Sequence, residues 1–198
     1  MNFEYLLKQI AFIQEIDKLK YIQRKTCLFN SQRKENDAEH SWHLAIMAMV
    51  LAEHANEPVD TMKVVKMLLI HDLVEIDAGD VFLFDTAINH TNTHAERLAA
   101  ERLFGLLPAE QAIEFTEIWE EFEAAATPEA RFAKSIDRLE PVLQNVSNGG
   151  GTWKEHQVSY EKVVQKVQTM AHGSETLWSF AKALIDDSVE KGFIQKEH

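Results

Sequence analysis

The sequence has little of several residue types. Its 198 residues include one cysteine, four prolines and seven glycines. A single cysteine excludes a disulfide within the chain and fits a reducing compartment. No stretch approaches the roughly 18 uncharged apolar residues of a membrane-spanning helix, and the first residues lack the basic and apolar regions of a secretion signal. We therefore expect a cytoplasmic protein without a membrane partner.

Basic residues are also few. The chain has 20 Lys and Arg against 32 Asp and Glu, and its formal net charge is −12. A nucleic-acid-binding surface needs a basic face, so this balance argues against nucleic acid as a partner. A small phosphorylated substrate stays compatible, because one local cluster of cations is enough to bind it.

Apolar residues recur at helical spacing along most of the chain, and strand patterns are essentially absent. This predicts an all-α fold, a compact bundle of seven or eight helices in a single domain over residues 1–198. The expected helices cover about 2–18, 37–55, 58–78, 92–106, 108–124, 128 onward, 155–171 and 175–191. Asn36 or Asp37 and Thr127 are candidate helix caps, Gly79 is a candidate helix stop, and residues 19–36, 80–91 and 148–151 are expected to be loops.

The doublet His71-Asp72 lies within the apolar run from Val64 to Glu75. Burying an ionised carboxylate without a partner is costly, so such groups are usually paired or bound to metal. His40 and Asp137 complete a set of four nitrogen and oxygen ligands, which suits one divalent ion such as Mn, Co, Fe, Zn or Ni. The alternative is that His71 is a core histidine bonded to Asp72 or to a backbone carbonyl.

These motifs, in this order, resemble the HD-domain superfamily of metal-dependent phosphohydrolases, over a motif core of about 24–141. His40, within Ala38-Glu39-His40-Ser41-Trp42, looks like the first metal ligand of the family; His71-Asp72 looks like its doublet and Asp137 like its final aspartate. Residues 119–123 and 130–134 resemble the 5′-deoxynucleotidase branch. The resemblance implies an HD-type bundle, with the C-terminal helices at about 155–191 completing it, and one bound divalent ion.

The same resemblance points to the groups around the ion. Glu75 and Asp80 match acids at the reaction centre of that branch, where a carboxyl group orients water or donates a proton. Arg24 matches a phosphate-binding arginine, and a guanidinium offers the two parallel donors that phosphate accepts. Arg33 and Lys34 are alternatives to Arg24. The relatives commonly have a tryptophan just after this arginine, but this chain continues with Lys25, so preference for a base or sugar does not carry over.

The expected function is a metal-dependent phosphomonoesterase that removes the 5′-phosphate of a nucleoside or deoxynucleoside monophosphate by attack of metal-bound water. One alternative is an HD-type hydrolase of another nucleotide, such as a triphosphate, dinucleotide or alarmone; the pair Glu75-Ile76 counts against the alarmone hydrolases. The other is a non-catalytic ligand-sensing protein that a metal stabilises. A homodimer is also expected, through apolar residues of the last helix such as Leu177, Phe180, Leu184 and Ile185.

Overall fold

The computed structural model describes residues 3–85 and 93–197. In this part of the chain, eight α-helices have eight residues or more: α1 (Glu4–Ile16), α2 (Asp37–Leu51), α3 (Thr61–Ile70), α5 (Thr93–Phe104), α6 (Ala109–Ala124), α7 (Pro128–Ser147), α9 (Tyr160–Val167) and α10 (Glu175–Glu190). Two shorter helices are α4 (Glu75–Ala78) and α8 (Gly151–Glu155). The predicted all-α fold is confirmed.

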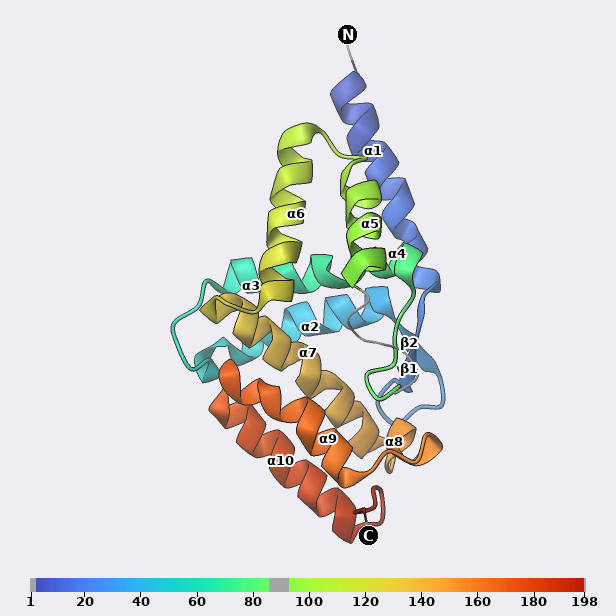
Figure 1. Cartoon of the computed structure of the whole chain (residues 1–198), viewed down its shortest axis with the longest axis vertical. Coiled ribbons are helices and arrows are strands. Elements are labelled where there is room, and N and C mark those ends of the chain that lie inside the picture. Colours follow the sequence, from blue (N-terminus) through green and yellow to red (C-terminus); the bar gives the residue numbers. More distant parts are fainter. Residues whose placement is uncertain (1–2, 86–92, 198) are drawn as a thin grey trace.

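Helices α2, α3 and α7 pack against one another in the middle of the molecule (Figure 1). Helices α1, α5 and α6 extend from this centre toward one end, while α8, α9 and α10 lie at the other. Side chains that are at most 2% exposed fill the centre, among them Leu44, Met67, Leu68, Phe132 and Ile136. The three central helices therefore meet over a tightly packed core, and polar groups buried there must have partners.

Side-chain caps lie at the N-termini of α2 and α7, where the sequence predicted them. Asn36 accepts a hydrogen bond from the Glu39 backbone N–H at 3.0 Å, and the Glu39 carboxylate accepts one from the Asn36 N–H at 3.2 Å. This capping box satisfies backbone donors that a helix start leaves unpaired. Thr127 caps α7 by accepting from the Ala130 N–H. Both predicted caps are confirmed.

The segment expected to be a loop over residues 19–36 contains regular structure. A 3₁₀ helix, η1 (Asp17–Tyr21), leads into an antiparallel pair of strands, β1 (Gln23–Cys27) and β2 (Lys34–Asn36). Alternation over three to five residues is too short to predict a strand from sequence. Other predicted helix boundaries were also wrong. Helix α3 begins at Thr61, with Asp60 as its cap, instead of near Pro58. Helix α8 occupies part of the loop expected over 148–151, and α9 begins at Tyr160 instead of near residue 155.

The helix expected over residues 58–78 is divided at the His-Asp doublet. Helix α3 ends at Ile70, a 3₁₀ helix η3 spans His71–Val74, and α4 follows directly. A 3₁₀ stretch that interrupts a helix often marks a functional hinge or a strained sequence. Gly79 ends α4 with a φ of 78°, so the predicted helix stop has the positive φ that favours glycine. The irregular stretch predicted over 80–91 lies partly outside the described residues.

The last helix mainly covers the chain's own core. Leu177 and Ile185 are buried in α10, at 5% and 0% exposed, whereas Phe180 is 53% exposed. The larger exposed apolar face belongs to α1, where Leu7 and Ile13 are 65% and 57% exposed. Within residues 3–85 and 93–197, no helix combines the length and apolar character needed to cross a membrane.

Candidate metal centre

The four predicted metal ligands meet in the centre of the fold. His40 comes from α2, His71 and Asp72 from η3, and Asp137 from α7. Nε2 of His40 lies 3.1 Å from Oδ1 of Asp137 and 3.9 Å from Oδ2 of Asp72. Nε2 of His71 lies 3.0 Å from Oδ1 of Asp72 and 3.8 Å from Oδ1 of Asp137. All four side chains belong to residues that are at most 8% exposed.

The surroundings of His71 place its proton on Nδ1. That nitrogen lies 2.9 Å from the carbonyl oxygen of Leu68, which can only accept a hydrogen bond. The other nitrogen, Nε2, then carries a lone pair, and it has no hydrogen-bond partner although it is buried. Fixing the tautomer through the remote nitrogen is the usual preparation of a metal-binding histidine.

His40 is arranged in the same way by two glutamates. Its Nδ1 lies 3.4 Å from Oε2 of Glu35 and 3.4 Å from Oε2 of Glu140. Both carboxylates are at most 1% exposed, and each can accept the Nδ1 proton. With the proton on Nδ1, the neutral imidazole turns the lone pair of Nε2 toward the carboxylates of Asp72 and Asp137, whereas the protonated imidazole donates from Nε2 to Oδ1 of Asp137 at 3.1 Å.

Two imidazole lone pairs thus face carboxylate oxygens, and acceptors in contact repel unless a positive charge lies between them. Without an ion, protons supply that charge. Burial opposes protonation of His71, but the charge of Asp72 raises the pKa of His71 to about 9. Burial likewise opposes ionisation of Asp72, yet His71 lowers the pKa of this carboxyl to about 2. A divalent ion would replace the protons, and the set of two nitrogens and two carboxylates fits Mn, Co, Fe, Zn or Ni.

Arg24 lies beside this centre, on β1, among four acids. Its Nη1 donates to Oδ2 of Asp72 at 3.1 Å and lies 3.5 Å from Asp37 and 4.0 Å from Asp80. Its Nε is 3.6 Å from Glu35. Burial would lower the pKa of the guanidinium, but the charges of Asp72 and Asp80 raise it, so Arg24 stays charged. The alternative Arg33 instead forms a surface pair with Glu39.

Glu75 and Asp80 also lie next to the centre, together with Asp37. One carboxylate oxygen of each lies within 4.8 Å of those of the other two. Burial and the negative charge of Asp72 raise the pKa of Glu75 well above its ordinary value, and burial raises the pKa of Asp80. Burial also raises the pKa of Asp37, to about 6. These groups retain protons nearer to neutral pH than ordinary carboxyls do, as proton-transferring groups often must.

A cavity of about 420 Å³ opens over the centre. Its wall includes Arg24, His71, Asp72, Glu75, Asp80 and Asp137 together with aromatic and basic residues of α6, α7, α8 and α9, such as Phe122, Lys134, Arg138, Trp153 and Lys166. The volume falls within the range of about 300–1,000 Å³ that small-molecule sites occupy. Of the predicted site residues, only His40 does not line it.

Three buried acids of the site were missed from the sequence: Glu35, Asp37 and Glu140. Glu140 follows Asp137 by three residues, and Asp37 precedes His40 by three, so helical spacing could have placed each on its neighbour's face. Glu35 lies on a strand that was not predicted. Nδ1 of His43 also lies 3.4 Å from Glu140. Helix α7, which carries Glu140, contains Pro141 and continues to Ser147.

Known proteins share both the sequence pattern and the fold. A sequence model of the HD domain family matches residues 16–178. The protein 5′-deoxynucleotidase HDDC2 from Homo sapiens is 30% identical over 136 residues, which are 68% of this chain and 65% of the human protein. The chain thus matches slightly less than two thirds of that relative's length.

The structural matches agree. The crystal structure of a predicted metal-dependent phosphohydrolase from Magnetospirillum magnetotacticum MS-1 is 50% identical, with a TM-score of 0.91 and coverage of 96% of this chain and 98% of that one. The PH0347 protein from Pyrococcus horikoshii OT3, at 24% identity, shares the fold with a TM-score of 0.64 over 88% of this chain and 99% of its own. Family match and helical architecture lead to one conclusion: the chain belongs to the HD domain family.

Proposed function

We propose that this protein is a metal-dependent phosphomonoesterase that removes the 5′-phosphate from a nucleoside or deoxynucleoside monophosphate. The observation that carries the proposal is the meeting of His40, His71, Asp72 and Asp137, in which Nε2 of His40 lies 3.1 Å from Asp137 and Nε2 of His71 lies 3.0 Å from Asp72. The similarity to a 5′-deoxynucleotidase and to a metal-dependent phosphohydrolase supports the substrate class.

These four residues would hold one divalent ion. When bound, such an ion lowers the pKa of a coordinated water and neutralises charge on a phosphoryl oxygen. In the hydrolysis, a water oxygen forms a bond to phosphorus while the bond from phosphorus to the 5′ oxygen of the sugar breaks. The proton lost by the water must leave the site, and the departing alkoxide must gain one.

Glu75 is suited to handle one of these protons. Its carboxyl lines the cavity, and its raised pKa favours the protonated form, which can donate to the leaving oxygen. Asp80 lines the same wall and can orient the attacking water through its carboxylate. We assign both residues to catalysis, in these complementary roles.

Arg24 would contact the phosphate. Its guanidinium donates to Asp72, a proposed ligand, so a phosphoryl oxygen beside the ion would also lie beside Arg24. The pairs with Asp37, Asp80 and Glu35 keep the side chain in place. Positioning of this kind lowers the entropic cost of reaching the reactive geometry.

The test is phosphate release from a panel of phosphomonoesters and nucleotides by protein loaded with Mn or Co. We expect activity on 5′-monophosphates. Glu75→Gln should lose most turnover while keeping its metal, and Asp137→Asn should lose both. The control Glu120→Gln changes an exposed acid on α6 and should behave as the unchanged protein. Metal binding without phosphate release from any compound would favour the ligand-sensing alternative.

Self-association and a cytoplasmic location stay predictions. The exposed apolar face of α1, defined by Leu7, Ile10 and Ile13, offers more surface for a homodimer than α10 does. Light scattering after gel filtration, with Leu7→Asp as the variant, would test it. A monomer at all concentrations for the unchanged protein would contradict the homodimer.

A further inference from the structure

Two pairs of side chains face each other where α2 packs against α7. His40 and His43 are three residues apart on α2, and Asp137 and Glu140 are three apart on α7, so each pair shares one face of its helix. Nε2 of His40 lies 3.1 Å from Asp137, while Nδ1 of the same ring lies 3.4 Å from Glu140. Nδ1 of His43 lies 3.4 Å from the other oxygen of Glu140. The contacts between the two helices therefore follow the order Asp137, His40, Glu140, His43.

This series of contacts is buried at the metal centre and reaches solvent at its other end. The side chains of His40 and Glu140 are 0% exposed, whereas that of His43 is 32% exposed. In the described part of the chain, neither Nδ1 of His40 nor Oε2 of Glu140 has a hydrogen bond of standard geometry. Because the contact between these two atoms is long, the position of Glu140 beside His40 depends on the other partners of that carboxylate.

Glu140 has two such partners, and one of them can carry charge. Gln144 donates from its Nε2 to Oε1 of Glu140, and Nδ1 of His43 approaches the same oxygen from α2. Burial opposes ionisation of Glu140, but His40 and His43 lower its pKa to about 2, so it is a carboxylate. Glu140 in turn raises the pKa of His43. His43 thus provides positive charge to Glu140 from the side opposite the metal ligand.

Neighbouring aromatic rings limit the rotation of His43. Phe29, in the turn between β1 and β2, meets the imidazole edge to face at a centroid distance of 5.7 Å. Trp42 stacks on it at 6.1 Å. The imidazole is therefore held on both sides with its Nδ1 near Glu140, although part of the ring is open to solvent.

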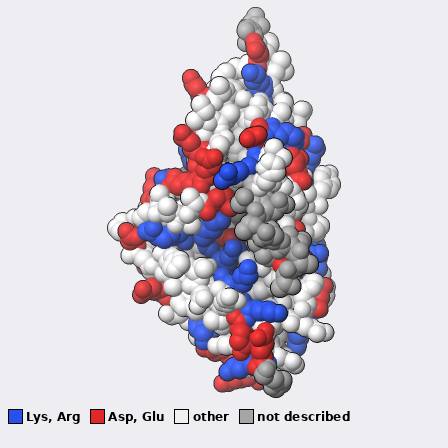
Figure 2. All heavy atoms as spheres, in the orientation of Figure 1, with Lys and Arg blue, Asp and Glu red and all other residues white. Residues whose placement is uncertain are grey.

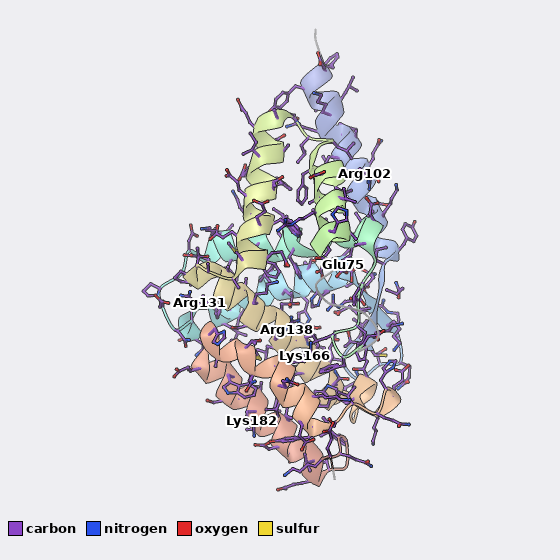
Figure 3. The ribbon with its side chains drawn as sticks, viewed as in Figure 1. Glu75, Arg102, Arg131, Arg138, Lys166 and Lys182 are labelled. Carbon is purple, nitrogen blue, oxygen red and sulfur yellow. The ribbon has the colours of Figure 1, made fainter. Side chains whose placement is uncertain are left out.

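His43 lies outside the cavity that a substrate would enter. Three residues of the cavity wall, Glu75, Arg138 and Lys166, are labelled in Figure 3. In the same orientation, Figure 2 shows basic side chains beside acidic ones over the region of α7. Among the described residues that line the cavity, neither His43 nor Glu140 is present. A change at His43 can therefore alter the metal centre without removing a group of the cavity wall.

We propose that His43 is a positioning residue of the metal centre, which holds Glu140 beside Nδ1 of His40 and so keeps Nε2 of His40 directed at the ion. This inference rests on the metal ligation proposed above and extends it to a residue near the surface. A partner on the remote nitrogen orients a metal-binding histidine and makes it a stronger ligand. A cation beside a buried carboxylate also offsets the cost of burying its charge.

The test measures metal binding by variants of His43. Metal-free protein is titrated with Mn by calorimetry, and the visible absorption bands of Co-loaded protein report the coordination of the ion. His43→Leu should weaken Mn binding roughly three- to tenfold, less than the loss of a direct partner of a ligand, and should shift the Co bands. His43→Asn keeps an N–H donor at the position of Nδ1 and should recover part of the affinity. The control His54→Leu changes a half-buried histidine of the 3₁₀ helix η2 (Ala52–His54) and should bind Mn normally.

A double-mutant cycle tests whether the effect passes through Glu140. In a Glu140→Gln background, His43→Leu should cause little further loss of Mn affinity, because the carboxylate that it positions is already gone. An equal loss in both backgrounds would overturn the inference. So would normal Mn affinity and normal Co bands in His43→Leu, even with a lower Tm, since His43 would then only support the fold.

Two further results have a defined meaning. If His43→Leu does not fold, His43→Phe replaces it in both backgrounds, because its ring has a similar shape and lacks the donor. If the unchanged protein binds neither Mn nor Co, the metal centre fails and this inference fails with it. Metal binding without phosphate release would contradict the proposed function alone, and the comparison of His43 variants would still decide the role of His43.

Discussion

Buried carboxylates surround Arg24 and His40 and determine the charge balance of this site. Glu35, Asp37 and Glu140 are each at most 1% exposed, and together with Asp72 they surround one arginine and one histidine. Buried acids that outnumber buried cations must take up protons or attract a cation. The protonation of single residues should therefore respond strongly to pH and to metal.

Asp37 illustrates the effect on stability. Its pKa of about 6 lies above the ordinary 3.8, because burial disfavours the charged form. The folded chain then holds a proton that the unfolded chain releases, so the free energy of unfolding falls as pH rises from about 4 to about 6. In metal-free protein, Asp37→Asn should raise this free energy by about 1–3 kcal/mol at pH 7.5 and change it little at pH 4. Thermal unfolding at both pH values checks this; stabilisation at pH 4 alone would contradict it.

Glu140 should act on the metal through His40. The carboxylate faces Nδ1 of His40 and accepts a hydrogen bond from Gln144, so it orients the imidazole. Glu140→Gln should weaken metal binding about 10–100-fold, the usual cost of removing such a partner. Calorimetric titration with Mn measures the loss, and Glu190→Gln, at an exposed position of α10, serves as the control. Unchanged affinity would show that Glu140 has no part in holding His40.

Helix starts and short turns place the site residues. The capping box at Asn36 begins α2, and Asp37 and His40 follow within its first turn. The 3₁₀ segment η3 carries His71 and Asp72, and the N-cap of α7 at Thr127 sets the start of the helix that carries Asp137. Fraying of α2 would therefore disturb the metal centre before it disturbed the rest of the fold.

Asn36→Ala tests this dependence. Loss of the cap should lower the free energy of unfolding by about 1 kcal/mol and also weaken metal binding, because His40 lies four residues into α2. Ser159→Ala removes the N-cap of α9, so it should lower stability without changing metal affinity. Denaturant unfolding and metal titration on both variants make the comparison. Equal effects of the two variants on metal affinity would refute the role of the α2 cap.

The molecule as a whole is organised around the meeting of α2, η3 and α7. His40 and His71 are 31 residues apart in the chain, and Asp72 and Asp137 are 65 apart. An ion bound by these residues would therefore connect segments that are distant in the sequence. Anything that binds only the folded state stabilises it. The metal should thus contribute to stability as well as to catalysis.

Removal of metal should lower Tm. At a hundredfold excess of metal over its Kd the stabilisation is about 2.7 kcal/mol, so a chelator should lower Tm by roughly 5–10 °C in a chain of this size. Asp137→Asn should show a much smaller shift under the same treatment. Scanning calorimetry with and without chelator measures both. A shift of equal size in the variant would mean that the chelator acts elsewhere.

The sequence alone determined the all-α class, the caps at Asn36 and Thr127, and the candidates His40, His71, Asp72 and Asp137, because helical periodicity, cap chemistry and ligand type are local properties of the chain. It did not predict β1 and β2, the 3₁₀ turn at the doublet, or the roles of Glu35 and Asp37. Only the tertiary structure decided that Nδ1 of His71 faces Leu68, that Arg24 lies among four acids, and that Arg138 and Lys166 share a cavity. The first of these facts depends on the 3₁₀ turn at the doublet, and the other two depend on contacts between residues distant in sequence, which arise only when the helices pack.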